Sequence, residues 1–382
     1  MSSSQNILIS GNEALALGAL KAGLKFYAAY PMTPASSILH FLASMEHEYK
    51  IIVKHTEDEI AAMNMVIGAS IAGVRAMCGT SGGGFSLMVE ALGFGAIVET
   101  PIVCVVGTRP GPATGMPTWT GQGDLRFVMH AAQDEFPRII LAPGDPQEGF
   151  VLGLRAFNLA DVYQMPVIIL TDKYFAESLF TVSLDAFNVK NSIDRGKMIP
   201  KQGDLTNPNA VYKRYDPDVK DGISPRAIPG TPGHLFLANS DEHDVYGYSE
   251  EDDDNRVRQM NKRMRKLESF VKNDEARAPI WYGKEGAQTT LLCWGSTKNS
   301  CLEVLKYHDD INVLHFTHLF PLDILKLDKE LKKVKKGIAV EGNYSGLFAD
   351  YLYEKTGFEV EKEIVKYDGR PFFVEELMQK IK

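Results

Sequence analysis

Five apolar runs, separated by segments of helical periodicity, constrain the fold of residues 1–190 more than any other feature of the chain. The runs are KFYAAY, VRAMCGT, TPIVCVVGT, FPRIILAP and MPVIILTD, and helices are expected at 11–24, 57–73, 84–99 and 146–164. Near-continuous apolar strands that alternate with helices are typical of a doubly wound parallel sheet, whose strands are buried on both faces. Residues 1–190 are therefore predicted to form an α/β domain of this kind.

Two rigid loops directly follow predicted strands. YPMTP, residues 30–34, holds Thr33 between two prolines, and GTRPGPATGMPT, residues 107–118, begins with Arg109 close to the end of its strand. Proline fixes its own backbone and biases the residue before it towards extended geometry. Because open α/β sheets bind ligands at the carboxyl ends of their strands, both loops are expected at a binding site.

The rest of the chain divides into two parts. Residues 191–285 are rich in Pro, Gly and Asp, and they include an acidic run, SDEHDVYGYSEEDDDN, followed by a basic amphipathic helix, RVRQMNKRMRKLESFVK. The acidic run could bind a divalent cation, but a solvated connector is favoured. From 286 to 382 the alternation resumes, with strands TTLLCWGS, INVLHFT and KGIAVEG between helices, and this predicts a second, smaller α/β domain.

Composition and charge exclude several classes of protein. Apolar residues make up 45% of the chain and charged residues 24%, as in ordinary globular proteins, and a net charge of −8 argues against nucleic acid or an anionic membrane as partner. Neither a transmembrane run nor a signal peptide is recognisable, so a cytoplasmic protein is expected. The four cysteines are scattered without a CxxC pair, which predicts buried reduced thiols and no iron–sulfur or zinc site.

Glu59 is the first candidate for chemistry. It opens the helical pattern EIAAMNMVIGASIAG, and helical steps from Glu59 reach Ala62, Met63 and Val66, so it shares the apolar face. An acidic residue at a helix start can simply complement the helix dipole, which explains Glu57 well. A buried carboxylate must instead find a donor or hold a proton, so Glu59 is either functional or a dipole-capping acid.

Three further features are weak when taken singly. Arg109 lies at the carboxyl end of a strand, and its guanidinium can form two parallel hydrogen bonds to a carboxylate. It could equally be a surface arginine. The glycines of CGTSGGGFSLMVE lie between a strand and a helix, where they allow close approach of a ligand or serve backbone geometry alone. They do not match the dinucleotide fingerprint. Thr33 offers a hydroxyl on a rigid turn.

Together these features resemble the alpha subunit of 2-oxoacid:ferredoxin oxidoreductases, which are thiamine-diphosphate enzymes that convert a 2-oxoacid and coenzyme A to acyl-CoA and CO2. The resemblance runs nearly end to end, and two departures are visible: Met32 replaces the isoleucine of the family's YPITP motif, and Gly83 stands where proline is common. The segments that carry it are GNEALALGALKAGLKFYAAYPMTPASS, EDEIAAMNMVIGAS, TSGGGFSLMVE, GPATGMPTWTGQGDL, EFPRIILAPGD, AFNLADVYQMPVIILTDKY, CWGSTKNS, VEGNYSGLF and KYDGRPF.

The resemblance implies roles for four residues. Thr33 would offer its hydroxyl to the carboxylate or keto oxygen of the 2-oxoacid, Arg109 would bind the substrate carboxylate, and Thr118 would line the same pocket. Glu59 would hydrogen-bond N1′ of the thiamine aminopyrimidine and promote loss of the proton from the thiazolium C2. The implied fold is a pyrimidine-type thiamine-diphosphate-binding domain followed by a transketolase-C-terminal-like domain with a role in scaffolding and assembly.

Two motifs that the complete reaction needs are missing from this chain, and their absence implies a partner subunit. The chain contains no GDG motif, with which thiamine enzymes hold the diphosphate through Mg²⁺, and no cysteine set for a [4Fe–4S] cluster. A beta subunit is therefore expected to contribute Mg²⁺ and the cluster, to share the thiamine diphosphate and to pass electrons to ferredoxin. The thiamine-pyrimidine half is expected to begin within the first ten residues, with no gamma domain ahead of it.

Alternatives remain open both for the identity of the 2-oxoacid substrate and for the class of protein. The loop GPATGMPTWT is most similar to that of 2-oxoglutarate and broad-specificity enzymes, so 2-oxoglutarate is the expected substrate, with pyruvate and branched-chain 2-oxoacids as alternatives. A non-catalytic scaffold on the same fold would not need Glu59, Thr33 and Arg109 together. A self-contained thiamine decarboxylase or transketolase would need the GDG motif, and a nicotinamide dehydrogenase would need the dinucleotide fingerprint.

Overall fold

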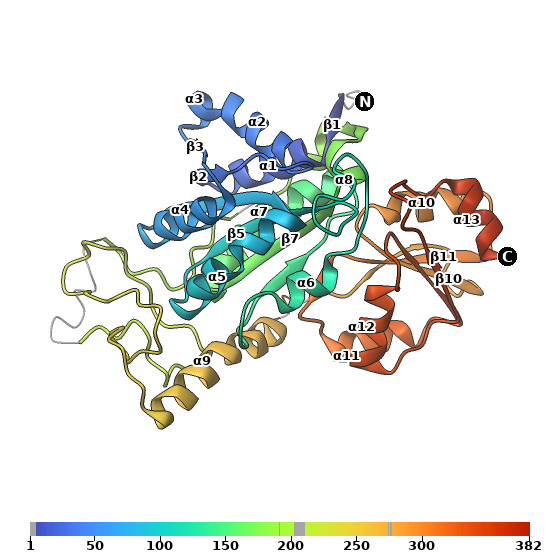
Figure 1. The fold of residues 1–382 in the computed structure, drawn as a ribbon. Helices are drawn as coiled ribbons and strands as arrows, with labels where there is room; N and C mark the ends of the chain where they lie inside the picture. Colours follow the sequence, from blue (N-terminus) through green and yellow to red (C-terminus); the bar gives the residue numbers. More distant parts are fainter. Residues whose placement is uncertain (1–4, 191, 202–210, 274, 276) are drawn as a thin grey trace.

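A seven-stranded sheet organises the N-terminal part of the chain (Figure 1). The computed structural model describes residues 5–190, 192–201, 211–273, 275 and 277–382. In spatial order the strands are β12 (His318–Phe320), β6 (Ile139–Leu141), β7 (Pro166–Asp172), β5 (Ile102–Thr108), β4 (Arg75–Ser81), β2 (Leu24–Ala29) and β3 (Ile52–His55). All neighbours pair in parallel except β12, which pairs antiparallel with β6. The five strands expected from the apolar runs are confirmed, whereas β3 and β12 were not foreseen.

Helices cover both faces of this sheet, as expected for a doubly wound fold. On one face lie α4 (Glu59–Ile71), α5 (Gly82–Ile97) and α6 (Leu125–His130), and on the other α1 (Gly11–Lys21), α2 (Ser36–Ser44) and α7 (Pro146–Tyr163). The remaining elements of this part are α3 (Glu46–Tyr49), α8 (Lys173–Glu177), the 3₁₀ helix η1 (Leu184–Phe187) and the antiparallel pair of β1 (Asn6–Ser10) and β8 (Leu179–Ser183).

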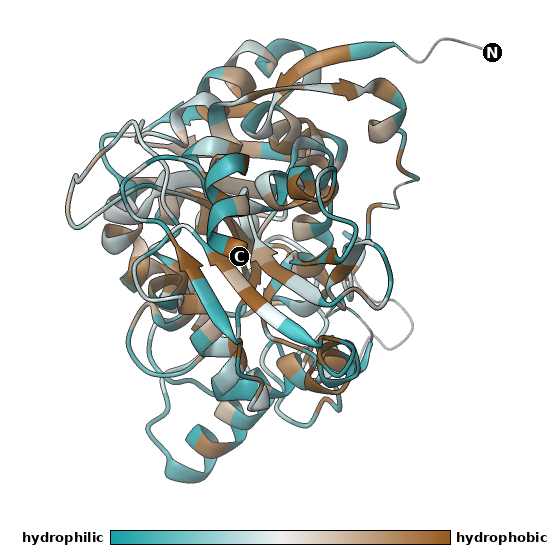
Figure 2. Ribbon diagram, turned by 90° about the vertical axis from the view of Figure 1, so that its right-hand side faces the viewer, coloured by the Kyte–Doolittle hydropathy of each residue, from teal (hydrophilic) through white to brown (hydrophobic). Residues whose placement is uncertain are grey.

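A second, five-stranded sheet forms the C-terminal part. Its order is β14 (Lys362–Val365), β13 (Lys336–Glu341), β10 (Thr289–Trp294), β11 (Ile311–Phe316) and β9 (Ile280–Gly283), with β9 antiparallel at the edge. Its helices are α10 (Thr297–Val304), α11 (Ile324–Leu331), α12 (Leu347–Thr356) and α13 (Val374–Ile381). In Figure 2 this domain faces the viewer, its strands carry hydrophobic stretches and its outer loops are mostly hydrophilic.

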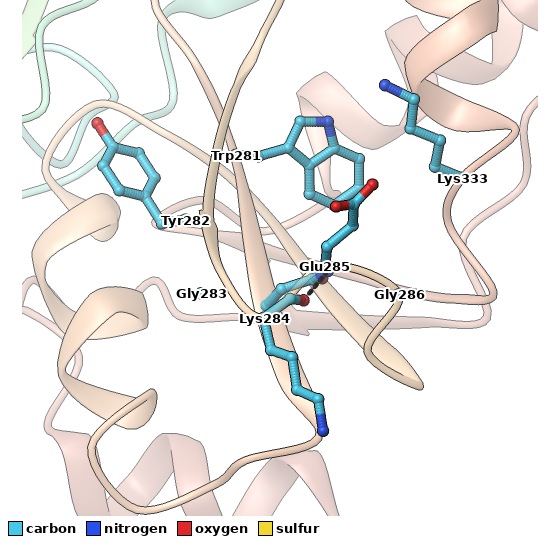
Figure 3. A pocket seen from close by; sticks show the side chains of 8 residues that line it. Trp281, Tyr282, Gly283, Lys284, Glu285, Gly286 and Lys333 are labelled. Carbon is cyan, nitrogen blue, oxygen red and sulfur yellow. Dashed lines mark hydrogen bonds between the residues drawn. The ribbon is translucent and has the colours of Figure 1, made fainter.

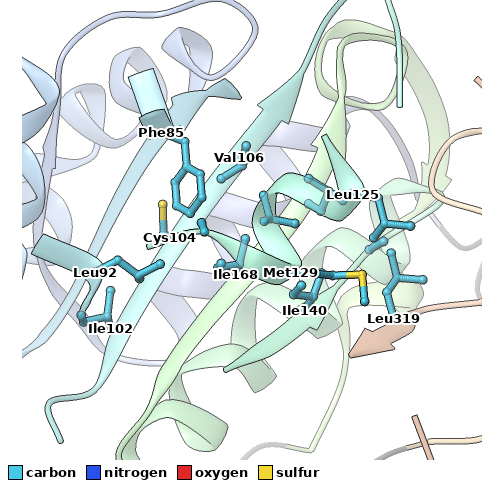
Figure 4. Close-up of a cluster of buried hydrophobic side chains, with 14 of the residues drawn as sticks. Phe85, Leu92, Ile102, Cys104, Val106, Leu125, Met129, Ile140, Ile168 and Leu319 are labelled. Carbon is cyan, nitrogen blue, oxygen red and sulfur yellow. The ribbon is translucent and has the colours of Figure 1, made fainter. Parts of the chain in front are cut away.

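The two sheets share one core. Figure 4 shows side chains of α5, α6 and strands β5, β6 and β7 meeting between helices and sheet, together with Leu319 of β12. The same cluster continues into the second domain through Trp294, Phe316 and Phe348, all nearly fully buried. Because β12 also extends the first sheet, the two domains are joined by apolar contacts and by backbone hydrogen bonds.

The helix α9 (Asp253–Lys272) packs against the first domain and leads from the connector towards the second domain (Figure 1). Asp252 of the acidic run caps it by accepting from the backbone of Asn255 at 2.8 Å, so part of that run serves as a helix start. Apart from Phe270, the buried residues of α9 are polar or charged. Among them, Lys262 and Lys266 both contact the fully buried carboxylate of Glu99. Residues 202–210 of the expected connector lie outside the described residues.

Two expectations from composition can be compared with the structure. All four cysteines are buried and free, as predicted for reduced thiols in apolar surroundings. Among the described helices, none has both the length and the apolar character needed to cross a lipid bilayer.

Candidate active site

Four neighbouring parallel strands end on one edge of the first sheet, and the candidate residues follow these ends. Thr33 lies in the loop after β2, Glu59 begins the helix after β3, α5 starts directly after β4, and Arg109 follows β5. The carboxyl ends of adjacent parallel strands meet at one edge, so side chains far apart in sequence converge there. The expected placement of both rigid loops at this edge is confirmed.

Glu59 is buried, as the helical pattern predicted, with 3% of its surface exposed. The side chain of Asp58 caps α4 by accepting from the backbone of Ala61 at 2.7 Å, and Glu57 is exposed. The Oε1 atom of Glu59 has no hydrogen-bond partner among the described residues. A buried carboxylate oxygen without a donor is costly, so the free energy of this arrangement favours a ligand that donates a hydrogen bond.

The glycine turn between β4 and α5 is shaped around this carboxyl. A Cβ atom at Gly84 would lie 2.6 Å from Glu59 Oε1 and would also collide with the hydroxyl of Thr80. Only glycine therefore lets α5 pass this close to Glu59. The residue before the helix, Ser81, is buried, and its hydroxyl has no partner among the described residues. Gly83 is exposed at the open first turn, whose backbone N–H groups favour an anion.

The structure brings Arg109 and Thr33 together. Arg109 Nη1 donates a hydrogen bond to the backbone carbonyl of Thr33 at 2.9 Å. Pro34 packs against Gly107, where a Cβ atom would lie 2.8 Å from the proline Cγ, so the YPMTP loop rests on the end of β5. Neither the Thr33 hydroxyl nor the other Arg109 nitrogens make a hydrogen bond within the described chain, which leaves them available to a ligand.

Thr118 is not brought into this cluster. It is exposed and makes no hydrogen bond to Thr33, Arg109 or Glu59 among the described residues. The loop that carries it folds back on its own start, because Met116 N donates to Pro110 O at 2.9 Å. Its substrate-binding role stays a prediction.

Residues of the second domain hold the loop after Arg109. Gln122 donates from Nε2 to the Trp294 carbonyl at 2.9 Å, and its backbone N–H and Oε1 pair with Gly342, each at 2.7 Å. The guanidinium of Arg370 stacks on Trp119, with 3.0 Å between Cζ and the ring centroid. These contacts fix the loop beside the site, and the wider scaffolding and assembly role of this domain stays a prediction. Gln122 was not singled out, although GPATGMPTWTGQGDL contains it.

Asp124 is a further ionisable group that the sequence reasoning missed. Its carboxylate packs against Gly82 at the start of α5. Burial raises the pKa of Asp124 to about 6, and the positive charge of Arg109 opposes that rise. The signal that points to it is its place at the end of the same motif.

One cavity of the molecule lies away from this edge. A cavity of about 430 Å³ in the second domain is lined by residues around β9, and Figure 3 shows Trp281 and Tyr282 pointing to opposite sides of that strand. No predicted site residue lines it. Within the described residues, no group of three or more His, Cys, Asp or Glu side chains is placed to hold a metal ion.

Comparisons with known proteins agree with this geometry. Residues 17–262 match the family described as pyruvate flavodoxin/ferredoxin oxidoreductase, thiamine diP-bdg. The chain is 37% identical over 391 residues to 2-oxoacid:ferredoxin oxidoreductase 1, subunit alpha, of Aeropyrum pernix, covering 99% of this chain and 60% of that relative. It is 28% identical to the 2-oxoglutarate synthase subunit KorA of Methanothermobacter thermautotrophicus, covering 99% and 98% of the two chains.

Solved structures give the same result. A 2-oxoglutarate:ferredoxin oxidoreductase from Magnetococcus marinus, with 2-oxoglutarate, coenzyme A and succinyl-CoA bound, superposes with a TM-score of 0.90 at 30% identity, covering 100% of this chain and 65% of that chain. A split gene transketolase at 14% identity and a TM-score of 0.50, covering 97% of this chain and 93% of that chain, shares the fold alone. The predicted thiamine-type α/β fold is confirmed. The chain spans about 60% of the length of the Aeropyrum relative.

Proposed function

Because the chain belongs to the pyruvate flavodoxin/ferredoxin oxidoreductase family, we propose that it acts as the alpha subunit of a 2-oxoacid:ferredoxin oxidoreductase. The reaction is the coenzyme A-dependent oxidative decarboxylation of a 2-oxoacid to acyl-CoA and CO2, with the electrons passed to ferredoxin. The observation that carries the proposal is the buried, unpartnered Oε1 of Glu59 beside Gly84, at the edge of the sheet where Arg109 and Thr33 meet.

Glu59 and Gly84 fit the aminopyrimidine of thiamine diphosphate. Glu59 Oε1 has no donor among the described residues and lies against Gly84, where any Cβ would collide with it, so this oxygen suits a ring that brings its own hydrogen-bonding nitrogen. When bound, thiamine diphosphate supplies the carbon nucleophile and the electron sink for decarboxylation. Glu59 would hold or release a proton at the ring nitrogen, and a positioned acid or base of this kind typically contributes about 10²–10⁴-fold.

Arg109 and Thr33 orient the 2-oxoacid. The hydrogen bond from Nη1 to the Thr33 carbonyl fixes the guanidinium plane and leaves its other N–H groups for the substrate carboxylate. The Thr33 hydroxyl, on the same loop, donates to the carboxylate or to the keto oxygen. Thr118 is proposed as a further substrate contact on the strength of the resemblance alone, because it is exposed and makes no hydrogen bond to Thr33 or Arg109 among the described residues.

A beta subunit covers the outer faces of α4 and α5. Ile60, Met65 and Leu87 are 40–51% exposed on these two helices, next to the helix starts that form the site. Apolar side chains grouped beside an incomplete site suit a protein partner. This subunit carries Mg²⁺, the [4Fe–4S] cluster and the contact to ferredoxin, and it shares the thiamine diphosphate.

The substrate proposed first is 2-oxoglutarate. The support is the bound 2-oxoglutarate named for the Magnetococcus structure and the 2-oxoglutarate synthase name of the Methanothermobacter relative. Pyruvate and branched-chain 2-oxoacids are the alternatives within the family. A non-catalytic scaffold is the alternative outside it, and the unpartnered Glu59 carboxyl argues against that function.

The chain purified alone is expected to be colourless and inactive with 2-oxoacid, coenzyme A and a viologen acceptor. The reason is that the half-site lacks the diphosphate motif and cluster ligands that we assign to the beta subunit. Adding that subunit should restore 2-oxoacid-dependent viologen reduction. A brown preparation that is active as a single chain contradicts the two-subunit site, and a complex inactive with every 2-oxoacid contradicts the proposed function.

Arg109→Lys is expected to lower kcat/KM for the 2-oxoacid by one to two decades. The guanidinium makes two parallel bonds to a carboxylate and an ammonium only a point contact, so about 1.5–3 kcal/mol of transition-state binding is lost. Thr33→Val should act in the same direction, and the double variant should be non-additive because both serve one ligand. Steady-state kinetics of the assembled enzyme measure this.

Arg258→Lys is the matched control for that series, since Arg258 is exposed and ion-paired only to Asp218 among the described residues. It should leave the kinetics unchanged. A defect of Arg109→Lys confined to thiamine diphosphate binding, or simple additivity with Thr33→Val, would place these residues outside the substrate site.

A further inference from the structure

Asn12 is a buried amide that the proposed chemistry does not yet use. It lies in the first turn of α1, and 1% of its surface is exposed. Its Nδ2 atom donates to the backbone carbonyl of Pro34 at 2.9 Å and to the hydroxyl of Ser37 at 2.8 Å. A carbonyl oxygen can only accept, so the amide nitrogen must be the atom that faces Pro34. Asn12 therefore holds the C-terminal end of the YPMTP loop from α1.

The YPMTP loop depends on donors from outside it. Two of its five residues are prolines, which lack a backbone N–H, so the loop has few donors of its own. The Thr33 carbonyl accepts from Arg109 Nη1 at 2.9 Å. The next carbonyl, that of Pro34, accepts from Asn12. Because the Thr33 side chain is attached at this segment, the direction of its hydroxyl depends on both bonds.

The start of α1 that carries Asn12 is itself rigid. Ser10 and Glu13 form a capping box, in which Ser10 N donates to Glu13 Oε2 at 2.8 Å and Glu13 N donates to Ser10 Oγ at 3.3 Å. A Cβ atom at Gly11 would lie 2.3 Å from the carbonyl oxygen of Phe175, so the helix start also packs closely against α8. Helices α1 and α2 lie side by side on one face of the first sheet (Figure 1). Asn12 is thus held in a fixed place beside the loop.

We propose that Asn12 is a positioning residue for substrate binding, which holds the backbone of residues 33–34 so that the Thr33 hydroxyl faces the ligand of Arg109. This inference rests on the proposed function and adds to it a residue that acts on the 2-oxoacid through the loop, without touching it. A displacement of about 1 Å at a reacting group can cost about 10²-fold in rate. The loss of an orienting hydrogen bond in this loop should therefore be visible in the kinetics.

Asn12→Ala in the assembled enzyme is the first test. It removes both hydrogen bonds without adding bulk or charge, and kcat/KM for the 2-oxoacid should fall by about 10–10²-fold. The affinity for thiamine diphosphate and KM for coenzyme A should stay unchanged. In a Thr33→Val background the same substitution should cost clearly less, because the hydroxyl that Asn12 positions is already absent. An equal loss in both backgrounds, or a general loss of cofactor affinity, overturns the proposal.

Asn312→Ala is the matched control. Asn312 is also buried, its Nδ2 also donates to a backbone carbonyl, that of Lys284 at 3.1 Å, and its Oδ1, like that of Asn12, lacks a partner among the described residues. It lies on β11 in the second domain, so this variant should lose stability and keep its kcat/KM. Equal kinetic losses in the two alanine variants overturn the proposal. If Asn12→Ala does not assemble, Asn12→Asp keeps the side-chain shape without the N–H donors and should give the same kinetic pattern.

The second test needs no activity. The N–H of Ala35 donates to the Met32 carbonyl at 2.8 Å, so hydrogen exchange of residues 32–37 reports how firmly the loop is held. In the full chain, Asn12→Ala should speed exchange in this segment about tenfold and leave β5 and β7 unchanged. Unchanged exchange in the loop, or the same increase throughout the chain, overturns the inference even if the complex is active. An inactive wild-type complex with the expected exchange pattern would instead overturn the proposed function alone.

Discussion

Glu59→Gln in the assembled enzyme is expected to cut turnover by about 10²-fold or more, the usual scale for removing positioned acid–base help. The amide can still hydrogen-bond, but it cannot exchange a proton with the cofactor's ring nitrogen. The folded chain should be as stable as the wild type or slightly more so, because the substitution removes a buried carboxyl whose Oε1 lacks a partner among the described residues. Turnover and thermal unfolding should be measured on the same preparations.

Glu57→Gln is the matched control, since Glu57 precedes the same helix and is exposed. It should leave turnover unchanged. If Glu59→Gln kept near-wild-type turnover and lowered the melting temperature, Glu59 would only stabilise the N-terminus of α4. The proposed catalytic role of Glu59 would then be wrong.

Glu99→Gln is expected to lower the free energy of unfolding by about 3–5 kcal/mol, the usual cost of removing one partner from a buried ionic group. Glu99 is fully buried, lies 2.6 Å from Lys266 Nζ through Oε2 and contacts Lys262 through Oε1. These ammonium groups hold the pKa of Glu99 well below its ordinary value. An amide would leave two lysines buried without a counter-charge. Urea unfolding followed by circular dichroism measures the loss.

Two further variants make that result interpretable. Glu251→Gln removes an exposed carboxylate of the same connector and should change stability by no more than about 0.5 kcal/mol. If Glu99→Gln does not fold, the triple variant Glu99→Leu, Lys262→Met, Lys266→Met should recover most of the stability, because apolar replacements remove the stranded charges. A Glu99→Gln chain as stable as the wild type would show that α9 does not depend on this cluster.

Local patterns were sufficient for the strands and helices that are long and strongly apolar. β4, β5 and β7 appear where their runs predicted them, and each is buried along its whole length. The edge strand β3 was missed because it is short and largely exposed, so neither continuous apolarity nor clean alternation marks it. The strand β12 has only three residues and exists because the first sheet offers an edge to the second domain.

The features of the candidate site likewise divide into those that local patterns predict and those that depend on the packed fold. The burial of Glu59 followed from helical spacing, and the place of Thr33 and Arg109 followed from the rule that loops after parallel strands share an edge. No comparable rule predicts three other features of the site. These are the missing partner of Glu59 Oε1, the contact of Asp124 with Gly82 and the hydrogen bonds between Gln122 and Gly342. Each joins groups that only the packed fold brings within reach.

The amino-acid sequence by itself determined the doubly wound sheet, the edge at which ligands bind and the carboxyl that turns inward from α4, because periodicity and strand ends are local properties. Only the tertiary structure decided which side of α9 is buried and which residues hold the loop after Arg109. Lys262 meets its counter-charge at Glu99, which is 163 positions away, and Gln122 meets Gly342 across 220 positions. The free energy of such charge pairs and hydrogen bonds depends on desolvation and close contact, which arise only when the connector and the two domains have packed together.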